Sequence, residues 1–583
     1  MIKNFKFLCV LAVLLTFSGC AERKEVADIL LIYNSKKEQT SDVNFRKISE
    51  YYGLLCGKTD LSETALTEDL FGNITTAGIN GANLERLKPD ELSLLKSKIS
   101  AGGMKLIVLM QESAEYKNLK KLTGNEVQGV AEAAQTGHYS VSARFPLITR
   151  EFTGHELNYP DMERIPCINV NKNAVSAFPL IAAGDGQAVF IYHKSGKGEI
   201  FFIAGKECPN LEENQMYKIY CSTESFYNLL PAMTAIRYSM GNRCWRNERN
   251  YANLTIDDPP LRQTTRPKDW MGLDYFGLLK ELKKHNYHIT IALIPGWMKF
   301  TEKSVVDLFL QNPDRFSIVQ HGNNHDGYEF WHYDPQPGDS RPPKPYRDQD
   351  EDLAEGMQRM NGFSKVTGIP WGRLIIFPGG ICPLRTFKLL KKYNFLCTVN
   401  YQREPLGEKP ADTYDYQMYP AEMSFGSFPS VRREHPGLHF PVLNFILFSM
   451  FIDTPFLIYD HAWDFKEGAK TYNLLADEVN RVTGGVEWRS LGEIAEHLYL
   501  ERERADGVIE VKMFSNGIVL ENKYEVQKKY RITKRENFDV PVKCVRVDNA
   551  KVKYKKKEDY ICVTTVIDAH SEKKIRIEYK GPK

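Results

Sequence analysis

The sequence lacks an excess of charge of one sign, a regular cysteine pattern and a long apolar run after its first residues. Its 77 basic residues are balanced by 74 acidic ones, so no overall field attracts nucleic acid or an anionic membrane. The 11 cysteines show no CxxC pair, which indicates no disulfide framework, although Cys208 and Cys221 are close enough in sequence to pair. The later apolar run at residues 441–452 is too short to cross a bilayer, so we expect it to be core.

The first twenty residues form a separate segment. A basic stretch at residues 1–6 precedes an apolar run at 7–17, and Ser18-Gly19-Cys20 ends it. This pattern resembles a bacterial lipoprotein signal, which implies removal of residues 1–19 and attachment of lipid to the Cys20 sulfur. The alternative is an ordinary secretory signal with an incidental cysteine. The lipoprotein signal predicts a lipid-anchored protein of the bacterial cell envelope, facing the periplasm or the outer surface. Such a protein touches the membrane only through its anchor.

The length of 583 residues exceeds what one core usually holds, so we expect two or three domains after the signal. Residues 20–247 alternate apolar strands with amphipathic stretches, which predicts an open α/β domain of the flavodoxin-like kind. This part contains no phosphate loop or nucleophile elbow, and we expect it to be accessory. Residues 505–583 contain short strands of alternating polarity, which predict a small antiparallel β-sandwich.

Residues 248–500 alternate strand and helix signals. An apolar stripe of helical period runs through residues 275–282, and further helix patterns lie near residues 304–311, 353–360 and 386–393. Repeated βα units of this size predict a distorted parallel (β/α) barrel, complete or incomplete. The proline-rich segment 333–350 follows one of the strands, and we expect it to shape the rim of a cleft.

Polar side chains stand where three of these apolar runs end. The run 252–256 ends in Asp257 and Asp258, the run 316–320 ends in His321, with His325 shortly after, and the run 456–459 ends in Asp460 and His461. Ligands and catalytic groups of parallel barrels sit at the carboxyl ends of the strands. We therefore expect two carboxylates and three imidazoles to converge on one mouth, as in a metal site that has its own acid and base.

These three motifs, in this order, resemble those of the polysaccharide deacetylase superfamily, also called carbohydrate esterase family four. The resemblance covers residues 248–500 and implies that Asp257 is the general base and His461 the general acid. It implies that Asp258, His321 and His325 bind a divalent metal ion, with Zn²⁺ the expected ion. The chain departs from the family pattern at Ile376, where an arginine is usual, at Pro259, where a glycine is common, and around residues 398–401, where the usual Asp-Trp pair has no clear match.

The chemistry of the residues agrees with these roles. One carboxylate and two imidazoles leave coordination positions open for water and a substrate carbonyl, and a bound divalent ion brings the pKa of water towards about 7. A second carboxylate then accepts the proton of the water, and an imidazole protonates the departing amine. Gly379 and Gly380, after another strand, could bring backbone N–H groups to the developing oxyanion.

Further residues complete the predicted site. Asp460 is a candidate to orient His461, and Trp297, Trp331 and Trp463 are candidates to stack on sugar rings. We therefore predict a metal-dependent carbohydrate deacetylase that acts on an N-acetylated polysaccharide or oligosaccharide, with a glycan and no nucleic acid as its partner; the sequence indicates no oligomeric state.

Three alternatives remain open from the sequence. A non-catalytic glycan-binding envelope lipoprotein with a degenerate barrel would explain the missing arginine. A glycosidase would need two opposed carboxylates instead of a metal ion. An iron oxygenase also uses two histidines and one carboxylate, but it is disfavoured because Asp258 precedes both histidines by about sixty residues on a βα unit.

Overall fold

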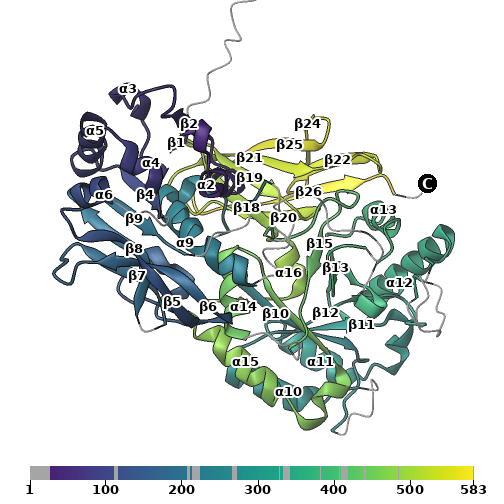
Figure 1. Ribbon diagram of the computed structural model, residues 1–583. Coiled ribbons are helices and arrows are strands. Elements are labelled where there is room, and N and C mark those ends of the chain that lie inside the picture. The colour runs from purple at the N-terminus through teal and green to yellow at the C-terminus, as the bar shows by residue number, and fades with distance from the viewer. Residues whose placement is uncertain are drawn as a thin grey trace, which may run out of the picture.

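The computed structural model describes residues 27–110, 116–184, 186–205, 210–212, 223–247, 249–265, 272–326, 329–331, 342–380, 382–405, 408, 418–436, 442–482 and 485–581. The predicted signal with Cys20, and the suggested pair Cys208 and Cys221, lie outside these residues. Figure 1 shows the first α/β part in purple and blue, a second α/β part in teal and green, and yellow sheets near the C-terminus.

The first part is built on a nine-stranded sheet. Its parallel half has the order β2-β1-β3-β4-β9, the arrangement of flavodoxin-like folds. The strands of this half are β1 (Ile29–Tyr33), β2 (Cys56–Asp60), β3 (Thr76–Asn80), β4 (Lys105–Leu109) and β9 (Gly198–Ile203). Its helices are α2 (Thr40–Tyr51), α3 (Glu68–Phe71), α4 (Gly81–Arg86), α5 (Pro89–Ser100), α6 (Lys117–Leu122), α7 (Pro146–Thr149) and α9 (Thr223–Met240).

The other half of this sheet is antiparallel, in the order β9-β8-β7-β5-β6. Its strands are β5 (Val127–Val141), β6 (Glu156–Val170), β7 (Ala177–Ala183) and β8 (Gln187–Ser195). A hairpin joins β8 to β9, with Ser195 opposite Gly198. The remaining antiparallel strands extend the sheet beyond a simple flavodoxin-like arrangement.

The second part is a nearly closed parallel barrel, in agreement with the prediction from the sequence. Seven strands pair in parallel in the order β15-β14-β13-β12-β11-β10-β16. They are β10 (Tyr251–Asp258), β11 (Ile289–Leu293), β12 (Phe316–His321), β13 (Trp371–Ile376), β14 (Thr398–Asn400), β15 (Ser430–Arg432) and β16 (Phe456–His461), and the short β17 (Glu487–Trp488) pairs with the start of β10. Just after β15, the Glu434 N–H donates to Leu457 O at 2.9 Å, and Tyr459 N–H donates to Glu434 O at 2.9 Å. The Glu434 backbone thus joins the end of β15 to β16, the two strands at the opposite ends of this order.

Amphipathic helices cover the outside of this barrel. Helix α10 (Tyr275–His285) begins where the Asp274 carboxylate accepts from Gly277 N–H at 2.9 Å, and it ends at Asn286 in the left-handed conformation. The other helices are α11 (Lys303–Gln311), α12 (Tyr346–Thr367), α13 (Thr386–Lys392), α14 (Val442–Phe451), α15 (Lys470–Asn480) and α16 (Leu491–Ala495). Of the predicted rim segment 333–350, residues 333–341 lie outside the described part of the chain, and α12 begins at Tyr346.

Two sheets near the C-terminus pack face to face around a common apolar core. One has the order β18-β19-β21-β25-β24 and the other β20-β26-β22-β23. The strands are β18 (Tyr499–Glu503), β19 (Ile509–Met513), β20 (Gly517–Glu521), β21 (Lys528–Arg535), β22 (Val542–Val547), β23 (Ala550–Val552), β24 (Lys555–Lys556), β25 (Tyr560–Ile567) and β26 (Glu572–Tyr579). The arrangement differs from the expected one in two respects, because β19 and β21 are parallel and the first strand begins at Tyr499 instead of after residue 505.

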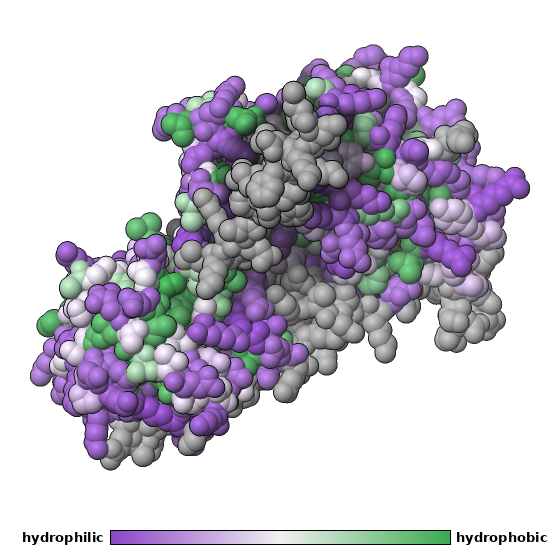
Figure 2. Space-filling view, turned by 90° about the horizontal axis from the view of Figure 1, so that it is seen from above, coloured by the Kyte–Doolittle hydropathy of each residue, from purple (hydrophilic) through white to green (hydrophobic). Residues whose placement is uncertain are grey.

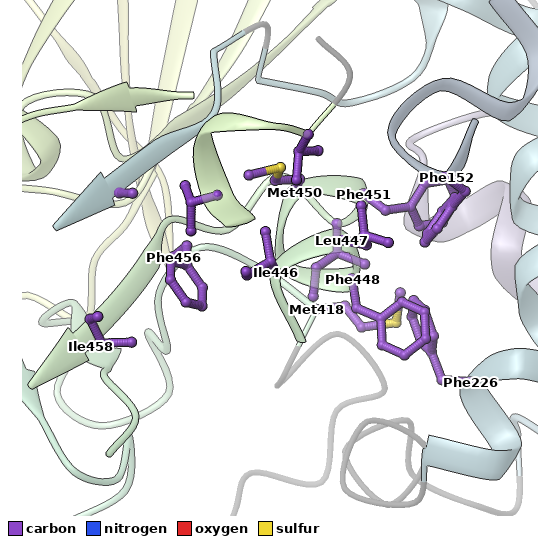
Figure 3. Close-up of a cluster of buried hydrophobic side chains, with 14 of the residues drawn as sticks. Phe152, Phe226, Met418, Ile446, Leu447, Phe448, Met450, Phe451, Phe456 and Ile458 are labelled. Carbon is purple, nitrogen blue, oxygen red and sulfur yellow. The ribbon is translucent and has the colours of Figure 1, made fainter. Parts of the chain in front are cut away.

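The first part and the barrel share one hydrophobic core. A single cluster of buried apolar side chains extends from Ile29 in β1 to Val482 after α15. Helix α14 lies between the two parts, and its Phe448 and Phe451 pack against Phe226 of α9 and Phe152 (Figure 3). The apolar run predicted to be core therefore joins the two parts instead of filling the centre of one.

A buried ion pair crosses the same interface. Arg237 of α9 donates to Asp453 after α14 at 2.8 Å, and both side chains are buried. The barrel is linked in a similar way to the C-terminal sheets, because the buried Lys391 of α13 lies 2.6 Å from Glu536 after β21. Breaking such a pair would leave an uncompensated buried charge, so these contacts hold the three parts in one arrangement.

The exposed face drawn in Figure 2 is mostly hydrophilic, with hydrophobic residues gathered in small separate groups. Among the described residues, no helix has the length and apolar character needed to cross a membrane.

Candidate active site

The carboxyl ends of β10, β12 and β16 place the predicted residues at one end of the barrel. Side chains along β10 alternate between the barrel interior and the surrounding helices, and Asp257 lies on the interior side opposite His461 of β16. Asp258, the last residue of β10, has a φ of +81°, which turns its side chain away from the regular alternation. The two neighbouring carboxylates can therefore serve different functions in one site.

Asp258, His321 and His325 converge as a potential set of metal ligands. Oδ1 of Asp258 lies 3.2 Å from Nε2 of His321 and 3.3 Å from Nε2 of His325. This oxygen is buried and has no hydrogen-bond donor among the described residues. Nδ1 of His321 lies 3.1 Å from the Ile376 carbonyl, which fixes the ring so that Nε2 faces the carboxylate. An orphaned oxygen facing two imidazole nitrogens fits a divalent cation.

The loop that carries the second histidine is held in an uncommon conformation. His325 has a φ of +52° and Gly322 a φ of +54°. The buried Glu329 carboxylate accepts from Asn324 N–H at 3.1 Å and from His325 N–H at 3.2 Å. Positive φ at Asp258 and His325 stores backbone strain at two of the three proposed ligands, a pattern found at functional sites.

Replacing Gly322 by alanine is expected to disturb this loop. The added Cβ would lie 2.0 Å from Oε2 of Glu329 and 2.7 Å from Cγ of Pro378. Gly468→Ala is the matched control, because Gly468 also has a positive φ but open space around its Cβ. We expect Gly322→Ala to be less stable than the control by about 1–3 kcal/mol in urea unfolding. We also expect about 10–100-fold weaker Zn²⁺ binding by calorimetry; equal stability of the two variants would contradict the assigned role of Gly322.

Asp257 forms a buried, two-pronged ion pair with Arg433. Nη1 and Nη2 of Arg433 donate to Oδ1 and Oδ2 of Asp257 at 2.6 and 2.5 Å, and both side chains are almost fully buried. Burial alone would raise the pKa of Asp257, but the Arg433 guanidinium outweighs it, so the pKa lies below its ordinary value. The ring of Tyr459 lies 4.2 Å from the guanidinium carbon and completes the surroundings of Arg433. Asp257 is thus ionised and fixed in position.

Arg433 was not found from the sequence. It follows β15, which has only three residues and therefore lacks the long apolar run by which a strand can be predicted. The arginine expected before Pro378 is absent, and Arg373, the nearest substitute in sequence, donates to the Tyr393 carbonyl at 2.8 Å. A guanidinium from a different strand therefore occupies the place beside the proposed base.

His461 lies at the end of β16 on the same side as Asp257. Its ring stacks on Trp463, with ring centroids 4.1 Å apart and planes 11° from parallel. Burial lowers the pKa of His461, although the Asp257 and Asp258 carboxylates act in the opposite direction. The stacking fixes the imidazole plane, so Trp463 contacts the proposed acid directly.

Asp460, the residue predicted to orient His461, contacts its backbone. Adjacent residues of a strand point to opposite faces, so the Asp460 side chain lies on the outer face of the barrel. Its Oδ1 accepts from the backbone N–H of His461 at 2.9 Å and lies 3.2 Å from Nε2 of His435, and its Oδ2 accepts from the Tyr472 hydroxyl. Asp460 thus contacts the His461 backbone and belongs to another group of polar side chains.

The structure places the predicted oxyanion and sugar-stacking residues in different surroundings. Gly379 and Gly380 lie in the turn Pro378–Gly380 with positive φ, but Gly380 N–H already donates to Phe377 O at 2.8 Å, so it is not free for an oxyanion. Trp331 is 4% exposed and packs in an apolar cluster, which corrects its assignment to a sugar-binding surface. Trp297 is half-buried in the turn Pro295–Phe300 after β11.

Comparison with known proteins gives only weak likenesses. No protein-family model matches the chain, and no curated protein matches it. Solved structures that resemble it include a Mycobacterium smegmatis protein assigned as a polysaccharide deacetylase, with 17% identity, a TM-score of 0.30, and coverage of 44% of this chain and 92% of that one.

Two further solved structures resemble the chain. The T48 deacetylase with substrate has 13% identity, a TM-score of 0.23, and coverage of 40% of this chain and 84% of that chain. The exo-β-1,4-mannosidase Op5Man5 from Opitutaceae bacterium strain TAV5 has 13% identity, a TM-score of 0.24, and coverage of 36% of each chain. At these TM-scores the similarities do not indicate a function. The chain thus has weak structural similarity to carbohydrate-active enzymes, deacetylases among them.

Proposed function

We propose that the protein is a metal-dependent deacylase that removes acetyl groups from an N-acetylated polysaccharide or oligosaccharide. One observation carries the proposal: a set of potential metal ligands lies at the same barrel end as a buried, ionised carboxylate and an imidazole. Asp258, His321 and His325 are the ligand set, Asp257 is the carboxylate and His461 the imidazole.

Asp258, His321 and His325 would hold the metal ion, with Zn²⁺ the expected one because imidazole and carboxylate ligands suit it. When bound, such an ion acidifies water and polarises a carbonyl oxygen. The fixed Nδ1 contact of His321 supports this assignment, because metal-bound histidines usually donate their other ring nitrogen to a backbone carbonyl or a carboxylate.

Asp257 and His461 transfer the protons of the reaction. Asp257, kept ionised by Arg433, accepts the proton of the attacking water. The protonated His461 ring, held by Trp463, donates a proton to the departing amine nitrogen. The lowered pKa of His461 makes its imidazolium a stronger acid for this step. The amide bond of the acetyl group breaks, and acetate and a free amine leave the site.

Arg433 also bears on the main alternative. A glycan-binding protein with a degenerate site was suggested by the absence of an arginine near Pro378, and Arg433 supplies a guanidinium to Asp257 from another strand. This contact favours an enzyme over a binding protein. We also propose that a lipid on Cys20 anchors the protein in the bacterial envelope. Cys20 lies outside the described residues, so this part of the proposal comes from the sequence alone.

Release of acetate from a panel of acetylated oligosaccharides tests the proposal. We expect release from at least one N-acetylated member, loss of release to background after exhaustive chelation, and recovery on addition of Zn²⁺. The Asp477→Asn variant, altered on the surface of α15, serves as a control with unchanged activity. Activity that survives the chelator would favour a glycosidase, and no release from any member would favour a binding protein.

A further inference from the structure

A second group of metal-ligating side chains lies on the outer face of β16. One atom each from His435, Asp460 and Asp464 lies within 4.8 Å of the other two. The three residues come from three segments: the stretch after β15, the strand β16, and the turn Ala462–Glu467. Alternation along β16 separates this group from the candidate active site, because Asp460 and His461 point to opposite faces of the same strand.

Asp460 is held in a fixed orientation at the centre of this group. Its carboxylate is buried, and Oδ1 lies 3.2 Å from Nε2 of His435. The Tyr472 hydroxyl donates to Oδ2, and the ring of Tyr472 stacks on Phe465 with centroids 4.3 Å apart. Metal-binding carboxylates are typically oriented by such outer hydrogen bonds.

The charges of the group are not balanced by basic side chains. Among ion pairs between described residues, neither Asp460 nor Asp464 pairs with a lysine or an arginine. The nearby guanidinium groups are engaged elsewhere, because Arg432 pairs with Glu434 at 2.5 Å and Arg433 with Asp257. Two carboxylates thus lie close together, beside the His435 imidazole and within electrostatic reach of His461.

The arrangement differs from an ordinary contact between histidine and acidic residues. His285 also touches two acidic side chains, but Nδ1 contacts Asp477 at 2.9 Å and Nε2 lies 3.6 Å from Glu281, on the other edge of the ring. Those atoms do not converge on a common point. In the group around Asp460, all three ligand atoms lie within 4.8 Å of one another, as they do in the Asp258 group.

We propose that His435, Asp460 and Asp464 bind a second divalent cation of the Zn²⁺ or Mn²⁺ type. One imidazole nitrogen and two carboxylate oxygens are ligands that both ions accept. The cation would link the segment after β15 to β16 where the Glu434 backbone closes the barrel, directly behind His461. This site goes beyond the deacylase proposal and does not depend on it.

Metal counting on the whole protein tests the second site. The protein is stripped with a chelator, loaded with Zn²⁺ alone, dialysed and measured by plasma mass spectrometry. We expect two Zn²⁺ per chain in the wild type, one in Asp464→Asn, one in Asp258→Ala, and none in the double variant. Asp477→Asn, which alters the His285 contact described above, should keep two.

Asp464 is exposed, so its substitution should leave the fold intact, and circular dichroism checks this. A second readout is the thermal midpoint: Zn²⁺ should still raise it in Asp258→Ala but no longer in the double variant. One Zn²⁺ in the wild type with no loss in Asp464→Asn would overturn the proposal, as would two Zn²⁺ in Asp464→Asn. Neither result depends on acetate release, so failure of the second site and failure of the deacylase proposal can be told apart.

Discussion

Replacing Arg433 by methionine is expected to lower the free energy of unfolding by about 3–5 kcal/mol, because the variant leaves the Asp257 carboxylate buried without its partner. Methionine keeps much of the side-chain volume, so the loss should come mainly from charge. Urea unfolding at neutral pH measures it. The double variant Arg433→Met/Asp257→Leu, which removes both charges, should recover most of the lost stability.

The effect of Arg433→Met should depend on pH in a defined direction. In the wild type, the pKa of Asp257 is below 3.8, so the ionised carboxylate adds stability above that pH. Without Arg433, burial raises the folded-state pKa, and the variant then loses stability as the pH rises through this value. The difference in unfolding free energy between the variant and the wild type should therefore decrease as the pH is lowered from about 7.5 to about 4.5. A gap that does not change over this range would contradict the assigned role of Arg433.

Replacing Asp257 by asparagine is expected to lower kcat for acetate release by about 10²–10⁴-fold, because asparagine cannot accept the proton of water. The metal content should stay at the wild-type value, since Asp258, His321 and His325 are unchanged. Steady-state kinetics on the oligosaccharide identified in the panel measures the loss. The folded fraction must be determined in parallel, because the substitution also leaves Arg433 without an anionic partner.

The comparison of Asp257→Asn with Asp258→Ala separates the two aspartates. Asp258→Ala should lose both metal from this site and activity, whereas Asp257→Asn should lose activity alone. Wild-type activity in the folded Asp257→Asn protein would reject Asp257 as the base.

The sequence predicted the barrel and the convergence of five polar side chains because each follows a strand with a clear apolar run. Asp258, His321 and His461 end β10, β12 and β16, and parallel strands bring their carboxyl ends to one side of the sheet. That signal requires only local pattern and a general rule of topology. It does not require knowledge of how distant loops fold.

Other parts of the site depend on information that local patterns do not hold. Arg433 follows a strand of three residues, and its contact with Asp257 depends on the closure of the ring. The outward direction of Asp460 could have been inferred from the alternation along β16, once His461 was placed inside. The burial of Trp331 depends on packing against Phe330 and residues of neighbouring strands, so composition alone cannot place it.

The aromatic packing of α14 on α9 sets a limit on how this protein can be divided. A recombinant fragment that starts near residue 248 would carry Phe448 and Phe451 with their partners removed, and each side chain represents about 1.5–3 kcal/mol of burial. Asp453 would also lose its guanidinium. The barrel is therefore not a detachable module, and its folding is coupled to that of the chain made before it.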